Sequence, residues 1–319
     1  MKKILLAGGA GYIGTRFCEE YKNLYDITVL DNFWFGDNLP DNVIRNKKNI
    51  LDTTEKDLEG FDTVIFMAGL SNDPMASFRP DLNFIENSSI PTYLAYISKQ
   101  AGIKKFIGAS SCSVYGFTKN KTLNENSNLK PSYPYGISKL QFERGIMLLE
   151  DENFKPVLFR KGTVGGWSKR MRFDLVVNTM TMTALTKKKI IVNNPNLWRP
   201  LIDVRDVVDA YKSVIESDEN ISGVYNLSGI NLMIGELGEI IYNTLSKHGI
   251  DVELEINNVK DFRNYKVDTS LIEDVFQFFP KYHPSDSVSE ILQHVLTDDF
   301  DFTNDLYYNI NIFKQTVGN

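Results

Sequence analysis

Residues 3–14 read KILLAGGAGYIG, a short apolar run followed at once by glycines three positions apart. The run Lys3–Ala7 predicts a buried strand, and a helix is expected to begin inside the motif formed by Gly8, Gly11 and Gly14. Without side chains, these residues let the backbone approach a pyrophosphate, whose negative charge is favoured at the amino end of a helix. The other interpretation of such a triplet is a tight strand-to-helix turn that binds nothing.

The next predicted strand, Ile27–Leu30, favours the ligand-binding interpretation. It runs into Asp31, 17 residues after Gly14, where a carboxylate can accept hydrogen bonds from both hydroxyls of an adenosine ribose. A carboxylate about 4 Å from a 2′-phosphate costs roughly 4 kcal/mol per unit charge at an effective dielectric constant of about 20. No Arg or Lys follows Asp31 directly, since Asn32, Phe33 and Trp34 come next. The sequence therefore predicts a dinucleotide site that selects NAD over NADP.

Strand and helix patterns alternate through the first half of the chain. Strands are predicted at Lys3–Ala7, Ile27–Leu30, Thr63–Met67, Lys105–Ala109 and Pro156–Arg160, with helices at Tyr12–Tyr21, Phe84–Ala101 and Tyr135–Glu150. This alternation predicts an α/β fold, a doubly wound parallel sheet with right-handed crossovers and helices on both faces. A short strand is also expected at Asn49–Leu51, followed by Asp52, which either meets the adenine edge or is an exposed loop carboxylate.

The pattern loosens after Arg160, where residues 162–170 are rich in glycine and basic residues. Beyond this stretch, strands are predicted at Val224–Leu227 and Val252–Ile256, with helices at Val204–Glu216 and Ile234–His248. We expect a cofactor domain over residues 1–165 and a smaller, mixed α/β domain over residues 166–319. Some segments of the second domain are expected to return to the first sheet.

Two Tyr-x-x-x-Lys pairs occur, Tyr115 with Lys119 and Tyr135 with Lys139. The spacing alone carries no weight, because chance predicts about one such pair in this composition. The pairs differ in what precedes them: Ser111 follows a predicted strand and lies 24 residues before Tyr135, whereas no serine stands at that offset before Tyr115. The second pair is therefore the candidate site.

Hydride transfer to or from a carbinol needs a group that takes or returns the hydroxyl proton. Lowering a tyrosine pKa from near 10 to about 7 takes roughly 4 kcal/mol, which the Lys139 ammonium and a cationic nicotinamide ring can supply together. Ser111 is expected to bind the same oxygen and hold it in place. The competing interpretation is a surface helix that carries Tyr135 and Lys139 by chance.

These motifs resemble the extended short-chain dehydrogenase/reductase family, in its nucleotide-sugar epimerase, dehydratase and reductase branch. The resemblance continues through Met67-Ala68-Gly69, Asn87, and residues 160–166, 198–206 and 263–265. It implies a Rossmann domain with NAD as cofactor, a nucleotide-diphosphate sugar as substrate, and a homodimer that pairs through the helices Phe84–Ala101 and Tyr135–Glu150. The cofactor contacts that it implies, beside the glycines and Asp31, are Tyr12, Ile13, Asn32, Asp52, Ala68, Asn87, Tyr135 and Lys139.

The resemblance also implies substrate contacts. Arginines at the places of Arg199 and Arg263 commonly grip the nucleotide diphosphate, although surface solvation is the alternative. Thr163 stands where many relatives carry a substrate-contacting Asn, and Asp203 where they carry His, so the identity of the sugar stays open. The segment Arg170–Asp174 resembles a substrate-side loop of polysaccharide-pathway members, and is otherwise a solvated basic loop.

Departures from the family pattern bear on the reaction. Members with 4,6-dehydratase activity carry an acidic pair just after the catalytic hydroxyl residue, where this chain has Cys112 and Ser113. The 3,5-epimerase/reductases carry a cysteine at the place of Ser113 and a later histidine, and the first histidine here is His248. We therefore expect chemistry at C4, as a 4-epimerase. The alternatives are a 4-dehydrogenase or 4-ketoreductase and, from another class, a non-catalytic dinucleotide-sensing protein.

Composition bears on several other classes of protein. The 35 Lys and Arg against 41 Asp and Glu leave a net charge of −6 over 319 residues, which argues against a duplex nucleic acid partner. No stretch approaches the ~18 apolar residues of a membrane span. The two cysteines and three histidines show no metal-ligand spacing, so no metal is expected. Two thiols in so long a chain are typical of reduced intracellular proteins, and a cytoplasmic location is expected.

Overall fold

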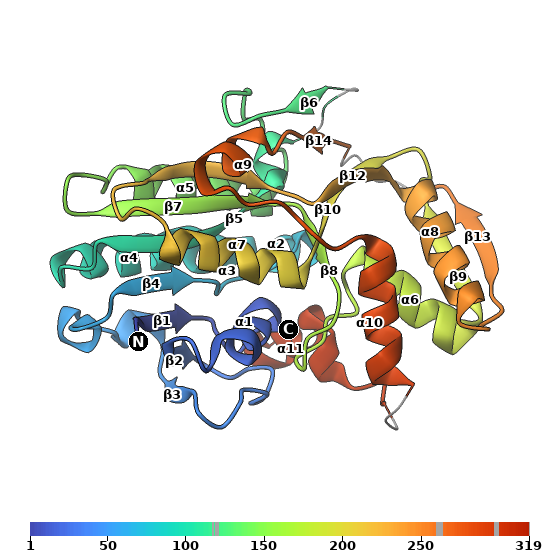
Figure 1. Cartoon of the computed structure of the whole chain (residues 1–319), viewed down its shortest axis with the longest axis horizontal. Coiled ribbons are helices and arrows are strands. Elements are labelled where there is room, and N and C mark those ends of the chain that lie inside the picture. The colour runs from blue at the N-terminus through green and yellow to red at the C-terminus, as the bar shows by residue number, and fades with distance from the viewer. Residues whose placement is uncertain (117, 119–120, 260–263, 297–299, 319) are drawn as a thin grey trace.

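The computed structural model describes residues 1–116, 118, 121–259, 264–296 and 300–318. At its centre lies a seven-stranded parallel sheet in the order β11-β7-β5-β4-β1-β2-β3 (Figure 1). The strand order reverses between β1 and β4, where a doubly wound sheet opens a crevice at its carboxyl edge. The predicted fold class is confirmed. The strands are β1 (Lys3–Ala7), β2 (Asp26–Asp31), β3 (Ile44–Lys47), β4 (Thr63–Phe66), β5 (Lys105–Ser111), β7 (Lys155–Lys161) and β11 (Gly223–Leu227).

Helices cover both faces of the sheet because its central strands bury side chains on both sides. Ile4 and Leu6 of β1 belong to a hydrophobic core shared with α1 and α7. Leu5, between them, points the other way into a core shared with α4 and α5. The four helices are α1 (Tyr12–Tyr21), α7 (Val204–Glu216), α4 (Ile90–Gln100) and α5 (Pro134–Met147).

Two segments between these strands differ from their predictions. The short strand expected at Asn49–Leu51 is wrong: this stretch holds a 3-10 helix, Ile50–Asp52, because the Asn49 side chain caps it by accepting a bond from the Leu51 amide. The helix expected from Phe84 begins earlier, since α2 (Asp73–Phe78), α3 (Pro80–Phe84) and a π-helical turn (Ile85–Ser89) lead into α4. A second 3-10 helix spans Glu55–Leu58.

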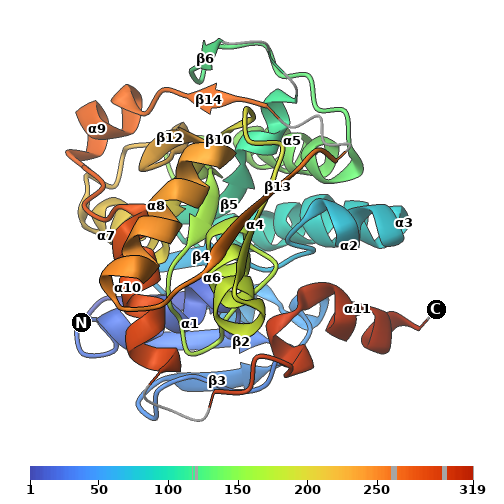
Figure 2. The ribbon, with the colours of Figure 1, turned by 90° about the vertical axis from the view of Figure 1, so that its right-hand side faces the viewer.

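Most of the chain after β7 lies beyond the carboxyl edge of the sheet, on the right of Figure 1 and facing the viewer in Figure 2. It forms three small sheets, β12-β10-β8, β13-β9 and β14-β6, of which β6 comes from the first half of the chain. In contrast, α7 and β11 return to the central sheet. The division at residue 165 stays a prediction.

The remaining elements have these bounds. The strands are β6 (Thr122–Leu123), β8 (Thr163–Gly165), β9 (Lys189–Asn193), β10 (Trp198–Asp203), β12 (Ile230–Met233), β13 (Glu253–Asn257) and β14 (Lys266–Val267). The α-helices are α6 (Val176–Lys187), α8 (Ile234–Lys247), α9 (Ser270–Phe276), α10 (Pro284–Val295) and α11 (Asn309–Val317), and further 3-10 helices span Cys112–Tyr115 and Asp305–Tyr307. Within the described ranges, no helix combines the length and apolar character needed to cross a bilayer.

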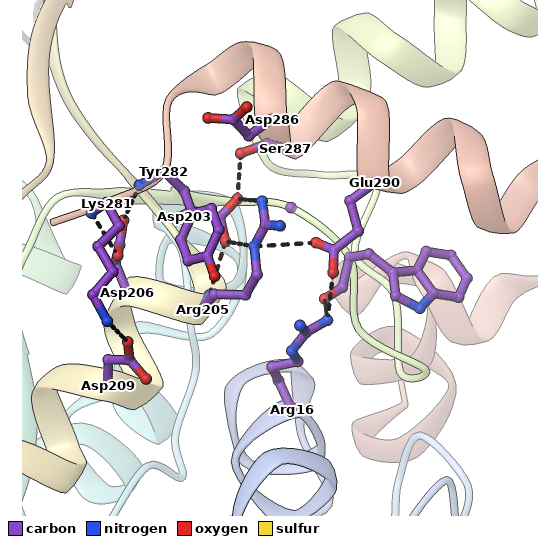
Figure 3. Close-up of polar contacts among 12 residues, drawn as sticks. Arg16, Asp203, Arg205, Asp206, Asp209, Lys281, Tyr282, Asp286, Ser287 and Glu290 are labelled. Atoms are coloured by element: carbon purple, nitrogen blue, oxygen red, sulfur yellow. Dashed lines mark hydrogen bonds and ion pairs between the residues drawn. The ribbon is translucent and has the colours of Figure 1, made fainter.

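A polar network joins α10 to both α1 and α7 (Figure 3). Asp203 caps α7 by accepting a bond from the Arg205 amide at 2.8 Å, and it also pairs with the Arg205 side chain. The Ser287 hydroxyl of α10 donates to the same carboxylate at 2.5 Å. Glu290 of α10 then bridges to Arg205 at 3.4 Å and to Arg16 of α1 at 2.8 Å. The carboxylate that stands in place of the family's His is therefore a structural group.

We expect Asp203→Ala to lower the free energy of unfolding by about 3–5 kcal/mol, the usual effect of breaking a buried ion pair. The substitution leaves four donors without their acceptor: the backbone amide, Nε and Nη2 of Arg205, and the hydroxyl of Ser287. Urea unfolding followed by circular dichroism measures the loss. The matched control is Glu255→Ala, which breaks an exposed pair with Lys189 and is expected to cost less than about 1 kcal/mol. Equal effects of the two substitutions would contradict the prediction.

Candidate active site

A cavity of about 510 Å³ lies at the carboxyl edge of the central sheet. The ends of β5 and β7, Ser111 and Lys161, both line it, as does the loop after β4. The cavity thus occupies the place where the strand order reverses. Its lining brings together the predicted residues Gly8, Gly11, Tyr12, Ile13, Gly14, Asp31, Asn32, Ala68, Asn87, Ser111, Tyr135, Lys139, Thr163 and Arg199.

The glycine loop is built so that only glycine fits at two of its positions. Gly8 has a φ of +83°, and a Cβ there would lie 2.4 Å from the Ala68 amide nitrogen. A Cβ at Gly14 would lie 2.4 Å from the Gly9 carbonyl oxygen. No side chain caps α1, whose N-cap residue is Gly11, so its first amides remain available to an anion. These features fit the pyrophosphate of a dinucleotide.

Asp31 is held at the cavity wall by backbone amides. Its carboxylate accepts bonds from the Ala10 amide at 3.0 Å and the Phe33 amide at 2.7 Å. Burial raises the pKa of Asp31, and these amide bonds oppose the rise. The carboxylate is therefore fixed beside the glycine loop, where the sequence placed the ribose of the cofactor.

A basic residue, Arg170, lies near Asp31 in the folded chain, although no Arg or Lys directly follows Asp31 in the sequence. Arg170 is 2% exposed, lines the cavity, and lies close enough to act on the Asp31 carboxylate electrostatically. Its guanidinium carbon lies 3.8 Å from the centroid of the Phe35 ring. Its Nη2 donates to Asn309 of α11 at 2.5 Å, and Asn309 donates to Ser71 at 2.7 Å. A segment distant in the sequence and the last helix thus complete the cofactor side of the cavity.

The charge of Arg170 is incompletely neutralised. Burial and the neighbouring Arg172 lower the pKa of Arg170 to about 9. Its Nε is buried and has no hydrogen-bond partner in the described part of the chain. Arg172, only 8% exposed, pairs with Asp174 at 2.7 Å. The interpretation of residues 170–174 as a solvated basic loop is therefore wrong.

The serine, tyrosine and lysine meet at the end of β5. Ser111 and Tyr135 both line the cavity, and the Ser111 side chain lies close enough to the Tyr135 hydroxyl to lower the pKa of the tyrosine. The Lys139 ammonium donates to the Ala109 carbonyl at 2.9 Å and lies 5.8 Å from the centroid of the Tyr135 ring. Pro134 begins α5, so Tyr135 and Lys139 are one turn apart on the face that meets β5.

The pKa of Tyr135 lies above its ordinary value in the cofactor-free chain. Burial raises the pKa of Tyr135, Asp73 raises it further, and Arg172 opposes this rise. Burial also lowers the pKa of Lys139 to about 8, which weakens its cationic character. That Lys139 and a positive nicotinamide ring together lower the tyrosine pKa stays a prediction, since the second of these charges comes with NAD when it is bound.

The other tyrosine has a structural role. Tyr115 is 1% exposed and lies outside the cavity lining. Its hydroxyl donates to Asn226 at 2.7 Å and accepts from Arg160 at 3.0 Å. Its sequence partner, Lys119, lies outside the described residues. The upstream serine thus identified the pair that faces the cavity.

Two predicted contacts are not found in the lining. Asp52 is exposed at the end of its 3-10 helix, while Asn49 and Ile50 line the cavity instead. Contact of Asp52 with the adenine edge of the cofactor therefore stays a prediction. Arg263 lies outside the described residues, so its contact with a diphosphate stays a prediction.

Sequence reasoning missed Lys161, Asn309 and the role of Asp174. Lys161 ends β7, so its place at the carboxyl edge was the one signal that pointed to the cavity. Asp174 accepts bonds from Arg172 and from the Asn72 amide at 2.7 Å, a contact between the two halves of the chain. No sequence pattern points to Asn309. It contacts Arg170 only because the fold places the start of α11 beside that residue.

Comparison with known proteins agrees with this geometry. Residues 4–228 match the model of the NAD dependent epimerase/dehydratase family. The chain is 28% identical over 257 residues to a dTDP-D-glucose 4,6-dehydratase of Dictyostelium discoideum, which covers 71% of this chain. It is 27% identical over 248 residues to an uncharacterized UDP-glucose epimerase of Bacillus subtilis, covering 71% of this chain and 77% of that protein.

Among solved structures, the chain resembles a UDP-N-acetylglucosamine 4-epimerase from Methanobrevibacter ruminantium in complex with UDP-N-acetylmuramic acid. The TM-score is 0.82 at 25% identity, over 92% of this chain and 99% of that one. The chain spans only 58% of the length of the Dictyostelium dehydratase. We therefore assign the activity of these relatives to this chain only as a proposal.

We expect Asp31→Asn to narrow the preference for NAD over NADP by about tenfold or more, because it removes the charge that repels a 2′-phosphate. Calorimetric titration of the cofactor-free protein with both dinucleotides measures the preference. Asp52→Asn is the matched control and should leave it unchanged. Binding of NADP as tight as that of NAD by the unaltered protein would contradict the role of Asp31.

Proposed function

The chain belongs to the NAD-dependent epimerase/dehydratase family, and we propose that it is a 4-epimerase acting on a nucleotide-linked sugar. The observation that carries this proposal is the gathering of Ser111, Tyr135 and Lys139 at one wall of the cavity, with the Lys139 ammonium 5.8 Å from the centroid of the Tyr135 ring. This arrangement supplies what oxidation at one carbinol needs, a proton acceptor and a group that positions the hydroxyl.

The residues after Ser111 support chemistry confined to C4. Cys112 is fully buried, its thiol donates to the Arg160 carbonyl at 3.1 Å, and burial raises the pKa of the thiol. Ser113 lines the cavity but offers only a hydroxyl, which is bonded to Ser111 at 3.1 Å. The acid–base pair of a dehydratase thus has no counterpart at these two positions.

The proposed reaction assigns one role to each residue. When bound, NAD supplies a reversible hydride acceptor at C4 and the positive charge that Tyr135 lacks. Tyr135 takes the proton of the C4 hydroxyl and returns it when the ketone is reduced on its opposite face, so the net change is inversion at C4. Ser111 holds the C4 oxygen throughout, and Lys139 favours the ionised tyrosine.

Arg199 and Thr163 support a nucleotide-sugar substrate. Arg199 is 7% exposed on β10 and lines the cavity beyond the cofactor side, where a guanidinium suits a diphosphate. Thr163, on the neighbouring β8, lines the same wall. The matching UDP-glucose epimerase and UDP-N-acetylglucosamine 4-epimerase make a UDP-linked sugar the first substrate to test.

We further propose that the protein is a homodimer that pairs through α4 and α5. Large apolar side chains remain exposed there: Tyr96 of α4 is 49% exposed, and Leu148, directly after α5, is 86% exposed. Pairing of these helices would remove this apolar surface from water.

We expect Tyr135→Phe to lower kcat by at least about 100-fold while cofactor affinity stays nearly unchanged, since only the proton-transfer group is lost. Tyr115→Phe is the control. It removes buried hydrogen bonds and should cost about 1–3 kcal/mol of stability, but it should keep most of the turnover. Steady-state kinetics and cofactor titration distinguish the two variants. An equal loss of turnover in both would overturn the choice of Tyr135.

Incubation with UDP-, dTDP-, GDP- and ADP-linked sugars in heavy water, followed by NMR, tests the reaction class. We expect a 4-epimer without deuterium in the ring, because hydride leaves and returns at C4 without exchange. Deuterium at C3, C5 or C6 would refute confinement to C4. Stoichiometric release of NADH with a 4-keto product would replace the epimerase by the dehydrogenase.

A further inference from the structure

We propose that Lys161 binds a carboxylate on the sugar, so that the preferred substrate is a nucleotide-linked sugar acid. This inference rests on the proposed function and specifies its substrate class. It follows from the direction of the Lys161 side chain, from the charges around it, and from the places already assigned to the other anions of the ligands.

The register of β5 and β7 sets the direction of the side chain. Ser110 is paired with Arg160, and Ser111 with Lys161. Ser110 and Arg160 both bind Glu143 of α5, at 2.5 and 2.8 Å, so they point to the same face of the sheet. Because side chains alternate along a strand, Ser111 and Lys161 point away from Glu143, and both line the cavity.

The position of Lys161 is therefore next to the reacting carbon. Adjacent strands are about 4.8 Å apart, so the lysine starts one strand spacing from Ser111, which lines the cavity beside the proposed catalytic tyrosine, Tyr135. A side chain of this length reaches substituents on the ring atoms around C4. Lys161 is thus placed to select among sugars rather than among nucleotides.

The surroundings of Lys161 are cationic. Lys139 of α5 and Arg172, from the segment before α6, are the charges that act on it, and with burial they lower the pKa of Lys161 to about 7. Asp174 already neutralises Arg172, and the Ala109 carbonyl binds Lys139. In the part of the chain that the structure describes, no carboxylate lies within 4 Å of the Lys161 ammonium. An anionic group of the ligand would supply the missing counter-charge.

The phosphates of the two ligands are not suited to this place. The glycine loop and the amino end of α1 fit the pyrophosphate of the cofactor, and Arg199 on β10 is the proposed partner of the sugar-nucleotide diphosphate. Lys161 lies beside Ser111, where the sugar ring is proposed to bind. The anion that it binds must therefore be on the sugar, and a carboxylate is the simplest group that provides it.

The test compares sugar acids with their neutral parents on the holoenzyme. In the nucleotide series that the panel above selects, one pair is the glucuronic acid and glucose derivatives, and the other is the N-acetylmuramic acid and N-acetylglucosamine derivatives. We expect at least a tenfold lower KM for the acid of one pair, and the pair that shows it tells whether the carboxylate is at C6 or on a C3 substituent. Lys161→Met should raise the KM of that acid at least tenfold, whereas Lys161→Arg should largely keep the preference.

Lys155→Met is the matched control, since Lys155 lies at the other end of β7 and pairs with Glu150 at 3.4 Å. It should leave the ratio of the two KM values unchanged. Calorimetry at pH 8 in buffers of different ionisation enthalpy adds a second readout. Binding of the acid should take up a proton, because the carboxylate raises the pKa of Lys161 from about 7 in its present cationic surroundings. Lys161→Met should abolish this uptake.

Four outcomes overturn the inference. A lower KM for the neutral sugars than for the acids shows that Lys161 does not bind a carboxylate. An equal rise in the KM of the acid and of the neutral sugar in Lys161→Met shows the same. Deuterium exchange at C5 that disappears in Lys161→Met makes the lysine a base instead. If no nucleotide sugar of any series is bound or converted, the proposed function itself fails and this inference with it. Turnover of neutral sugars alone removes only the carboxylate assignment.

Discussion

The buried ion pair between Arg160 and Glu143, 2.8 Å long and about 5% exposed at both ends, aligns α5 with the two strands that end in the active site. Tyr135, Lys139 and Glu143 recur every four residues on one face of α5. Glu143 holds the helix to β5 and β7, and Lys139 binds the end of β5. A charged pair in the core thus fixes the positions of Tyr135 and Lys139 relative to the end of β5.

Because of this alignment, adjacent residues at the ends of β5 and β7 have different polar partners. Ser110 and Arg160 both donate to Glu143, whereas Ser111 and Lys161 line the cavity and make no hydrogen bond to this carboxylate. The cationic groups on the cavity side are only partly neutralised, and burial has shifted the pKa values of Lys139 and Lys161 downward. The site is therefore electrostatically incomplete without bound anions, while the core beneath it is already satisfied.

Sequence analysis succeeded where function depends on local spacing. The glycine loop, Asp31 and the pairing of Ser111 with Tyr135 follow from strand ends and helix starts, and these are set by residues within a few positions. The strand expected at Asn49–Leu51 was wrong because a side-chain cap at Asn49 begins a 3-10 helix there. That competition between a strand and a cap is decided by a single hydrogen bond, which a pattern of apolar residues does not reveal.

The cofactor side of the cavity shows a different limit, because it is assembled from segments that no local pattern connects. Arg170 acts on Asp31 electrostatically, and Asn309 of α11 and the Phe35 ring contact its guanidinium. That helix is in turn seated by Phe313, which stacks on Trp34 with 6.2 Å between the ring centroids. The loop after Asp31 therefore contacts α11, and the geometry around the Asp31 carboxylate depends on both. No basic residue directly follows Asp31 in the sequence. The charges around the Asp31 carboxylate in the folded chain come instead from tertiary packing, which brings Arg170 near it.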